Sequence, residues 1–322
     1  MSPPVTRLAP SPTGALHLGN ARTFLVNWAM ARRSGWRIVL RIEDLDGPRV
    51  KPGAIEGVIS TLRWLGMDWD EGPIVQSADL SPYEDAMRAL ARGAMAYPCE
   101  LTRGQIEAAA SAPHEAPAEG EDRSAPGQES RFPSSLRPAL WARGFDRLDT
   151  NWRFATPGGE VSFVDGFAGA QRRSPAESIG DFVVWTKRGQ PAYQLAVVVD
   201  DHRQGVTHVV RGDDLLDSAA RQLLLHRALG LAPEPAYFHL PLVVGPDGRR
   251  LAKRHGDTRI DRFRAEGAAP ERVVAIIARW CGLGVAGRMS GAEFAARLEP
   301  ASIPRRPIVC TPEDHAWLLR DD

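Results

Sequence analysis

Two short segments of the chain carry side chains suited to phosphate chemistry. In the first, from Arg7 to Asn20, His17 and Asn20 lie three positions apart. At a helix start this spacing puts both side chains on one side of the first turn, where each can donate to a phosphate oxygen. A helix start also offers unpaired backbone N–H groups, and Gly19 lets a flat ligand approach the backbone. The segment predicts a nucleotide site, although a loop with Thr13 as a helix cap explains the same residues.

The second segment is rich in basic residues and has a glycine at each end. It reads Gly248-Arg249-Arg250-Leu251-Ala252-Lys253-Arg254-His255-Gly256. Its charges would stabilise a phosphate during transfer, and an exposed basic turn is the alternative. The Walker P-loop is excluded, because Asn20 and Ala21 follow Gly19 where that motif needs Lys and Ser or Thr. A dinucleotide oxidoreductase is disfavoured, because no Gly-x-Gly-x-x-Gly follows an expected strand.

Polar residues also follow several of the expected strands. They are Glu43, Asp200, Arg211 and Asp214. In an open parallel sheet the ligand binds at the carboxyl ends of the strands, so these side chains are candidates for a site. Tyr193 stands at the start of its apolar run, where a packing role is the simpler interpretation.

The elements that must position these residues follow from the hydrophobic pattern. Residues 5–9 predict a strand, 10–14 a loop, 16–33 a helix that stops at Gly35, and 36–42 a second strand. This is a βαβ unit, which begins a parallel sheet. Further helices are expected at 54–65, 82–94, 218–229 and 270–280, and strands at 193–199, 207–210 and 239–244.

Composition limits the class of protein. The chain has 322 residues, 43% apolar and 25% charged, with 40 basic and 40 acidic side chains and no net charge. These values are typical of a globular protein, and they exclude one defined by uniform positive charge. No apolar run reaches the ~20 residues that span a bilayer, and no secretory signal is evident. Three widely separated cysteines indicate reduced thiols, so a cytoplasmic protein without a membrane partner is expected.

The chain is expected to divide into four parts. Residues 1–98 and 181–245 are the two halves of a catalytic domain, and 99–180 are an inserted subdomain with a mobile loop at 108–130. Short strands within 152–165 and 181–187 suggest that the insertion is rich in β-structure. Residues 246–322 form the lysine loop and a mainly helical region, of which 287–322 has no assigned role.

Five segments, in order between residues 7 and 256, resemble the glutamyl branch of class I aminoacyl-tRNA synthetases. They are Arg-x-Ala-Pro-Ser-Pro-Thr-Gly-x-Leu-His-Leu-Gly-Asn, Arg-Ile-Glu-Asp-Leu-Asp, Tyr-Gln-Leu-Ala-Val-Val-Val-Asp-Asp, Val-Arg-Gly-Asp-Asp-Leu-Leu-Asp and Leu-Ala-Lys-Arg-His-Gly. His17 to Asn20 resembles the family's HIGH signature, and residues 250–254 its KMSKS loop. The resemblance implies an α/β fold with a Rossmann-like catalytic domain, an inserted subdomain and a C-terminal mainly helical region.

The resemblance also implies an amino-acid pocket. Arg7 would hold the side-chain carboxylate of L-glutamate by a bidentate pair, with Ser11 beside it. Glu43 would take the ammonium group of the substrate, and Tyr193 and Arg211 would complete the pocket.

The same resemblance implies an ATP site. His17 and Asn20 would act on the ATP phosphates, with Gly19 and Asp214 also binding the nucleotide, and Lys253 would stabilise the departing pyrophosphate. Mg²⁺ would accompany ATP. The glutamate carboxylate would attack the α-phosphorus directly, so catalysis would rest on positioning and charge stabilisation.

The acceptor of the glutamate separates the branches of the family. Only 66 residues follow Gly256, and residues 193–195 and 214–218 resemble the short branch that attaches glutamate to queuosine in tRNA(Asp). A monomer that acts on this tRNA is therefore expected. The Arg-His-Gly after Lys253 resembles full-length synthetases, which keeps charging of a tRNA 3′ end open. A catalytically silent tRNA-binding protein is the third alternative.

Two departures from the family pattern concern the metal and the lysine loop. Short-branch members commonly bind zinc through Cys-x-Cys and a later Tyr-x₃-Cys, whereas Cys99 is followed by Leu101 and no cysteine occurs again before Cys281. Because a tetrahedral zinc site needs about four ligands, we expect no zinc and a structural role for Cys99. Ala252 and Arg250 replace a serine and a lysine of the loop, with an effect that the sequence does not reveal.

Overall fold

The N-terminal βαβ unit is present as predicted. The computed structural model describes residues 3–110, 131–249, 251 and 257–320. Strand β1 (Val5–Leu8) leads through helix α1 (Leu18–Ser34) to β2 (Arg37–Ile42), which pairs parallel to β1. Gly35 ends α1 in the left-handed conformation (φ 67°), where its N–H bonds to the carbonyl of Ala31.

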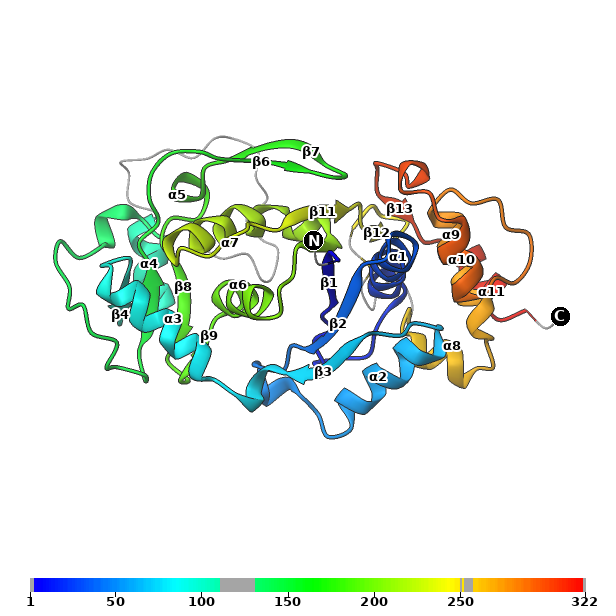
Figure 1. The fold of residues 1–322 in the computed structure, drawn as a ribbon, viewed down its shortest axis with the longest axis horizontal. Coiled ribbons are helices and arrows are strands. Elements are labelled where there is room, and N and C mark those ends of the chain that lie inside the picture. Colours follow the sequence, from blue (N-terminus) through cyan, green and yellow to red (C-terminus); the bar gives the residue numbers. More distant parts are fainter. Residues whose placement is uncertain (1–2, 111–130, 250, 252–256, 321–322) are drawn as a thin grey trace.

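A parallel sheet reverses its strand order next to β1. Strand β3 (Glu71–Val75) pairs with β2, and β10 (His208–Gly212) pairs with β11 (Ala236–Leu240), both in parallel. Strand β1 lies beside β10, because the N–H of Thr207 donates to the carbonyl of Val5 at 2.9 Å. The three-stranded sheet β1-β2-β3 and the sheet that contains β10 and β11 therefore meet at β1 and β10. Taken together, the order β3-β2-β1-β10-β11 is that of a doubly wound nucleotide-binding fold, whose ligand crevice opens where the order reverses. Strands β1, β2 and β3 are labelled in Figure 1. The α/β fold is as predicted.

The β-strands expected in the insertion belong to two sheets. Strands β4 (Ala96–Cys99), β5 (Asn151–Phe154), β8 (Phe182–Thr186) and β9 (Gln190–Pro191) form a separate antiparallel sheet, seen at the left of Figure 1. The hairpin β6 (Val161–Asp165) and β7 (Gly169–Arg173) instead joins the central sheet at β11. Strand pairing therefore crosses the boundary expected at residue 180, and the division into domains stays a prediction.

The strand predicted at residues 193–199 is wrong, because this segment is helix α6 (Tyr193–Arg203). Residues 194–201 are all buried, since α6 lies among α3 (Ser81–Arg92), α7 (Leu216–Ala228) and β8. A helix buried on every side has the same unbroken apolar run as a strand buried on both faces. Asp200 and Asp201 consequently lie in the last turns of a buried helix, and Tyr193 lies at its start.

The C-terminal region is mainly helical, as expected, and packs against α1. Its helices are α8 (Ile260–Ala265), α9 (Pro270–Trp280), α10 (Gly291–Arg297) and α11 (Pro312–Leu318). The strand predicted at 239–244 is interrupted at Pro241, so that β12 (Val243–Val244) is separate and pairs with β13 (Ile308–Val309). Residues 287–322 had no assigned role, and β13 within them thus supports β12, the strand that precedes the basic loop.

Three further helices, α2, α4 and α5, belong to segments that the sequence analysis described. Helix α2 (Ala54–Trp64) confirms the expected helix at 54–65. Helix α4 (Arg103–Ala110) includes residues 108–110, which were expected to begin a mobile loop; residues 111–130 of that loop lie outside the described residues. The short helix α5 (Pro175–Ser178) precedes β8.

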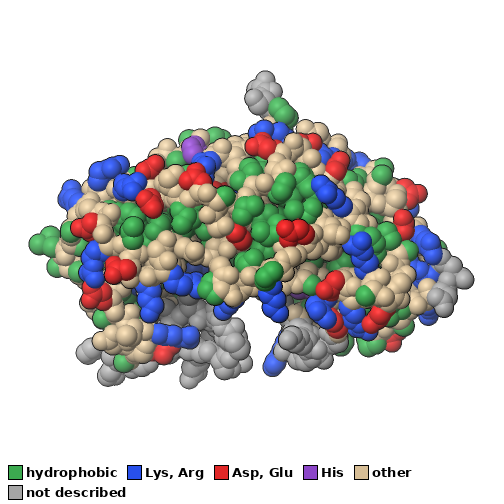
Figure 2. Space-filling model, turned by 90° about the horizontal axis from the view of Figure 1, so that it is seen from below, with side chains coloured by type: hydrophobic (Ala, Val, Ile, Leu, Met, Phe, Trp, Pro, Cys, Tyr) green, Lys and Arg blue, Asp and Glu red, His purple; other side chains and the backbone are tan. Residues whose placement is uncertain are grey.

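Four global features of the described residues concern the thiols, the surface charges, the helices and the metal-ligating side chains. The three cysteines are free and buried. On the face drawn in Figure 2, basic and acidic side chains are intermixed. Among the helices that the structure describes, none is long and apolar enough to cross a membrane. Within the same residues no group of three or more His, Cys, Asp and Glu side chains is arranged to hold a metal ion.

Candidate active site

Two buried arginines mark the reversal point of the sheet. Arg7 lies on β1 and Arg211 on the neighbouring β10, and each is 5% exposed. Both lie toward the carboxyl ends of their strands, the edge at which open α/β sheets bind ligands. Burying a guanidinium group is costly unless an anion or hydrogen-bond acceptors compensate it, so the partners of each arginine indicate its role.

The residue that caps the start of helix α1 is His17 rather than Thr13. The imidazole Nδ1 accepts the N–H groups of Gly19 at 3.1 Å and Asn20 at 3.3 Å. An accepting Nδ1 is unprotonated, so the proton of a neutral His17 resides on Nε2. The capping role suggested for Thr13 is therefore wrong.

The first turn of α1 is also internally satisfied. Besides the two N–H groups that His17 accepts, the N–H of Leu18 donates to Thr258 and that of Ala21 to the His17 carbonyl. The expectation of unpaired N–H groups at this helix start is wrong, although the partial positive charge of the terminus remains. A Cβ at position 19 would lie 3.1 Å from the His17 ring, so Gly19 gives room to the capping imidazole.

The start of α1 is hydrogen-bonded to residues that follow the basic segment 248–256. The N–H of Leu18 donates to the carbonyl of Thr258 at 2.9 Å, and the N–H of Ile260 donates to the carbonyl of Leu16 at 2.8 Å. These bonds hold the chain that follows the basic loop against the start of α1. Arg250, Ala252 and Lys253 lie outside the described residues, so their predicted roles stay predictions.

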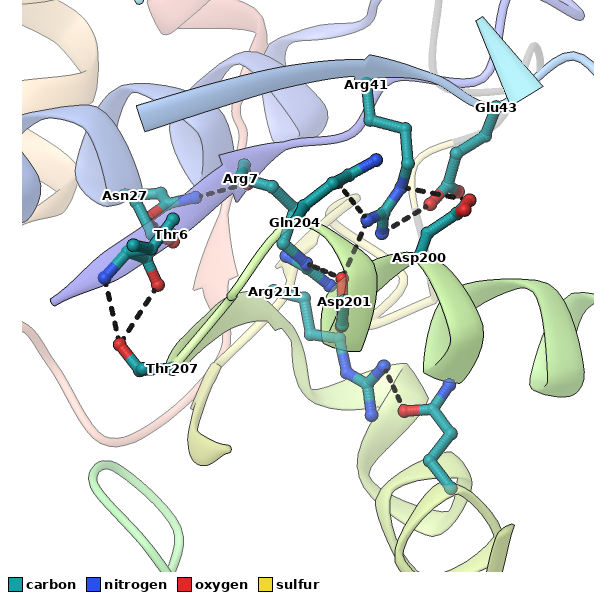
Figure 3. Close-up of polar contacts among 12 residues, drawn as sticks. Thr6, Arg7, Asn27, Arg41, Glu43, Asp200, Asp201, Gln204, Thr207 and Arg211 are labelled. Atoms are coloured by element: carbon teal, nitrogen blue, oxygen red, sulfur yellow. Dashed lines mark hydrogen bonds and ion pairs between the residues drawn. The ribbon is translucent and has the colours of Figure 1, made fainter. Parts of the chain in front are cut away.

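A buried ionic cluster, defined here as Arg7, Arg41, Glu43, Asp200 and Asp201, joins the first strands to α6 (Figure 3). The Asp201 carboxylate accepts from Arg7 Nε at 3.2 Å and from Arg41 at 2.8 Å. Arg41, whose side chain is fully buried, also lies 3.2 Å from Glu43 and 3.9 Å from Asp200. The cluster ties the arginine of β1 to the carboxylate that follows β2.

The carboxyl groups of the cluster differ in their pKa values. Burial opposes ionisation of Asp201, but the charges of Arg41 and Arg7 outweigh it and lower its pKa. Burial raises the pKa of Glu43, and Arg41 and Arg7 offset this only in part. Burial likewise raises the pKa of Asp200, against the charge of Arg41. Asp201 is therefore the firmly ionised member, and Glu43 and Asp200 are the members whose ionisation a bound cation would favour.

Arg211 has a different kind of surroundings. Its Nε donates to His239 at 2.9 Å, and its two terminal nitrogens donate to Gln222 at 2.9 Å and to the Leu215 carbonyl at 3.2 Å. Its guanidinium carbon lies 5.2 Å from the centre of the Tyr237 ring. All of these partners are uncharged, whereas Arg7 contacts a carboxylate.

Comparison with known proteins places the chain in a family. The description "tRNA synthetases class I (E and Q), catalytic domain" matches residues 4–301. The chain belongs to this family. Like other class I tRNA synthetases, the protein is a ligase that uses ATP.

Curated relatives and solved structures of class I tRNA synthetases match most of this chain. The glutamyl-Q tRNA(Asp) synthetase of Rhodopirellula baltica is 50% identical over 88% of this chain and 86% of its own length. That of Symbiobacterium thermophilum is 48% identical over 94% of each chain. Glutamate–tRNA ligase 2 of Chelativorans sp. is 40% identical over 86% of this chain and 56% of its own. The glutamate-tRNA synthetase structure from Elizabethkingia anophelis has a TM-score of 0.79 and 25% identity, over 98% of this chain and 70% of that one.

The remaining described residues predicted for the synthetase site lie on four different segments. Tyr193 is 40% exposed, and Arg211, Glu43 and Arg7 lie close enough to influence the pKa of its hydroxyl group. Asp214 lies in the turn directly after β10. Ser11 is exposed on the loop after β1, and Asn20 is half-buried in the first turn of α1.

Several polar residues near the site escaped the sequence analysis. Arg41 interrupts an otherwise apolar strand and is buried there. A charged residue within such an apolar run indicates a buried charge with a partner, and this signal was present in the sequence. His239, in an aromatic and apolar strand, gave the same kind of signal. Asp165, Gln204 and Gln222 gave none, because each becomes a partner only through the tertiary fold.

Proposed function

We propose that this class I tRNA synthetase activates L-glutamate with ATP and transfers it to the queuosine base of tRNA(Asp). One observation carries the activation step. Arg7 and Arg211 lie buried where the strand order reverses, and the start of α1 is hydrogen-bonded to Thr258 and Ile260, which follow the basic loop. Two cations suit a dicarboxylate, and the neighbouring helix start and basic loop suit a polyphosphate.

The two arginines would divide the work of binding glutamate. In this proposal Arg7 forms a bidentate pair with the side-chain carboxylate, and Arg211 and Tyr193 complete the pocket, with Ser11 at its edge. Glu43 takes the ammonium group, and that new cation lowers the raised pKa of Glu43, so that the ion pair forms within the pocket.

The reaction needs no protein nucleophile. The α-carboxylate oxygen of glutamate bonds to the α-phosphorus of ATP, the bond to the β-phosphate oxygen breaks, and pyrophosphate leaves. We propose that His17, through Nε2, and Asn20 act on the phosphates, and that Gly19 and Asp214 border the nucleotide. Lys253 would stabilise the leaving pyrophosphate.

Mg²⁺ would enter with ATP. Magnesium in such sites usually keeps several waters and takes its other ligands from phosphates and one or two carboxylates. Zinc has no part in the proposal.

The second step transfers glutamate to a hydroxyl group of the tRNA. A hydroxyl oxygen bonds to the acyl carbon, the acyl–phosphate bond breaks, and AMP leaves with the proton passing to water. Identities of 50% and 48% to enzymes named glutamyl-Q tRNA(Asp) synthetase favour queuosine as the acceptor. The structural likeness to glutamate-tRNA synthetases supports the alternative, charging of a tRNA 3′ end. We further propose a monomer that works in the cytoplasm, where its tRNA is found.

Glutamate-dependent ATP–pyrophosphate exchange tests the first step. We expect the wild-type protein to catalyse exchange with L-glutamate and not with L-glutamine. The Arg7→Ala variant should lose at least ~100-fold in kcat/KM, because it removes a buried charge pair to the substrate. Arg37→Ala, which removes a surface ion pair of β2, is the control and should retain wild-type exchange. A wild-type protein without exchange would be the silent tRNA-binding protein instead.

Labelled glutamate tests the acceptor. Pure tRNA(Asp) with queuosine should become labelled, and the same tRNA transcribed without the modification should not. Labelling of tRNA(Glu) at its 3′ end, whether or not the tRNA carries queuosine, would support the alternative.

A further inference from the structure

Beyond the residues assigned to glutamate, a buried polar chain reaches Arg211 from the neighbouring strands β11 and β6. It begins at Asp165, at the end of β6, whose carboxylate accepts the N–H groups of Phe167, Ala168 and His239. Burial opposes its ionisation, but these bonds and the His239 side chain outweigh burial and lower its pKa. Asp165 is therefore a fixed, ionised acceptor with no access to solvent.

The imidazole of His239 stands between Asp165 and Arg211. Nδ1 lies 2.6 Å from the Asp165 carboxylate, and Nε2 accepts the Nε–H of Arg211 at 2.9 Å. A carboxylate can only accept and a guanidinium can only donate, so both neighbours require the neutral tautomer with its proton on Nδ1. The Tyr237 ring stacks on His239 with centroids 5.8 Å apart, which fixes the plane of the imidazole.

A second chain fixes the other side of Arg211. Gln222 accepts from Arg211 and donates to Gln194 at 3.0 Å, and Gln194 donates to Ser218 at 3.0 Å. This sequence of bonds directs the carbonyl of Gln222 toward the arginine. Together with the Leu215 carbonyl, the described residues occupy three of the five N–H donors of Arg211, which leaves two for a ligand.

The arrangement orients Arg211 without neutralising it. Direct contact with a carboxylate would compensate the charge, as Asp201 does for Arg7 and Arg41. Here an uncharged ring separates Asp165 from Arg211, so the guanidinium is held rigidly while its charge stays available to an anion. Preorganised charge of this kind is a costly feature for stability alone and a useful one for binding a carboxylate.

We propose that His239, oriented by Asp165, is the positioning residue that aims Arg211 at the carboxylate of the amino-acid substrate. The inference deepens the proposed function and rests on Arg211 belonging to the glutamate pocket. His239 acts only through Arg211 and contacts neither substrate nor nucleotide.

Two substitutions separate positioning from folding. His239→Asn can still donate to Asp165 but cannot reach Arg211, whereas His239→Gln can place a carbonyl oxygen near the position of Nε2. In ATP–pyrophosphate exchange we expect His239→Asn to raise the KM for glutamate about tenfold and to leave the KM for ATP within about twofold. His239→Gln should recover most of the glutamate affinity. His208→Gln, at the opposite end of β10 from Arg211, is the control and should change neither constant.

The outcomes distinguish this inference from the proposed function. A wild-type enzyme without glutamate-dependent exchange refutes the proposed function, whereas exchange with an unchanged glutamate KM in His239→Asn refutes the positioning role. An equal rise in the KM for both substrates also overturns it, because that pattern shows a general structural effect.

A spectroscopic measurement keeps the inference testable even if His239→Asn fails to fold. In wild-type protein labelled with ¹⁵N-histidine, the His239 resonances, assigned with the His239→Gln variant, should show a protonated Nδ1 and an unprotonated Nε2. A proton on Nε2, or on both nitrogens at neutral pH, would overturn the proposal.

Discussion

At the scale of single residues, the carboxylate of Asp201 determines how the substrate arginine of β1 is held. It is the shared acceptor of Arg7 and Arg41, and its side chain is only 4% exposed. Removing its charge leaves two buried guanidinium groups with weaker compensation, so both affinity and stability depend on it.

Asp201→Asn should therefore lower the free energy of unfolding by about 3 kcal/mol and raise the KM for glutamate at least tenfold. Denaturant titration and exchange kinetics measure the two effects. Asp68→Asn breaks an exposed ion pair with Arg32 and should cost less than about 1 kcal/mol. Equal losses in the two variants would contradict the account of the buried cluster.

Gly19 allows a second residue-scale prediction. An added Cβ would lie 3.1 Å from two atoms of the His17 ring, which caps α1, so Gly19→Ala should displace the imidazole. We expect kcat for exchange to fall about tenfold, with stability changed by less than about 1 kcal/mol. Gly57→Ala, in α2 with open space around it, is the control and should keep wild-type kcat. An unchanged kcat in Gly19→Ala would remove His17 from the phosphate site.

At the scale of elements, the attachment of the segment after residue 131 to β8 depends on one glycine. Gly180 has φ +70°, and a Cβ there would lie 2.0 Å from the carbonyl oxygen of Phe132. Gly189 has nearly the same φ, but the nearest atom to its Cβ would be 3.8 Å away. Comparing alanine substitutions at Gly180 and Gly189 therefore separates the cost of backbone strain from the cost of steric overlap.

Gly189→Ala should cost about 1–2 kcal/mol of stability, the strain of a left-handed alanine. Gly180→Ala should cost at least ~3 kcal/mol, because the backbone contact between residues 132 and 180 must also open. Chemical denaturation of both variants measures the difference. Indistinguishable losses would show that the contact at Phe132 contributes nothing.

The elements also show what the sequence could reveal. Periodicity and glycine placement predicted β1, α1 and β2, because their apolar residues face one core and Gly35 ends the helix locally. Residues 193–199 defeated the same reasoning, since α6 is buried on every side and its pattern loses the helical period. The helical conformation of this segment depends on its burial among elements that are distant in the sequence.

The candidate site divides in the same way. The family motifs pointed to Arg7 and Arg211, which the fold places on adjacent strands. They could not reveal that His17 Nδ1 caps helix α1, or that Asp165 contacts His239, which accepts a hydrogen bond from Arg211. Asp165 and His239 are 74 positions apart, and single-sequence patterns carry no information on such pairs.

At the scale of the whole molecule, buried histidines make stability depend on pH. His226 and His239 are 2% and 1% exposed, and burial first of all lowers the pKa of each. Below about pH 6.5 these histidines become protonated in the unfolded chain but stay neutral in the folded protein. The free energy of unfolding therefore falls as the pH is lowered. The raised pKa values of Glu43 and Asp200 act in the opposite direction and reduce the loss.

Between pH 7 and 5 we expect a decline of at most about 1.4 kcal/mol per pH unit for each of the two histidines. Denaturant titrations across this range measure the slope, and His226→Leu should make it shallower. A stability that rises on acidification, or a slope unchanged in His226→Leu, would contradict the assignment.

The central claim is that glutamate is activated at the reversal point of the sheet and passed to queuosine. Its most direct test is to label queuosine-containing tRNA(Asp) with radioactive glutamate, digest the product with ribonuclease, and locate the label. The account predicts that the label stays with the queuosine nucleoside, including in tRNA that lacks its 3′-terminal adenosine. Label on the 3′-terminal adenosine, lost when that nucleotide is removed, would contradict it.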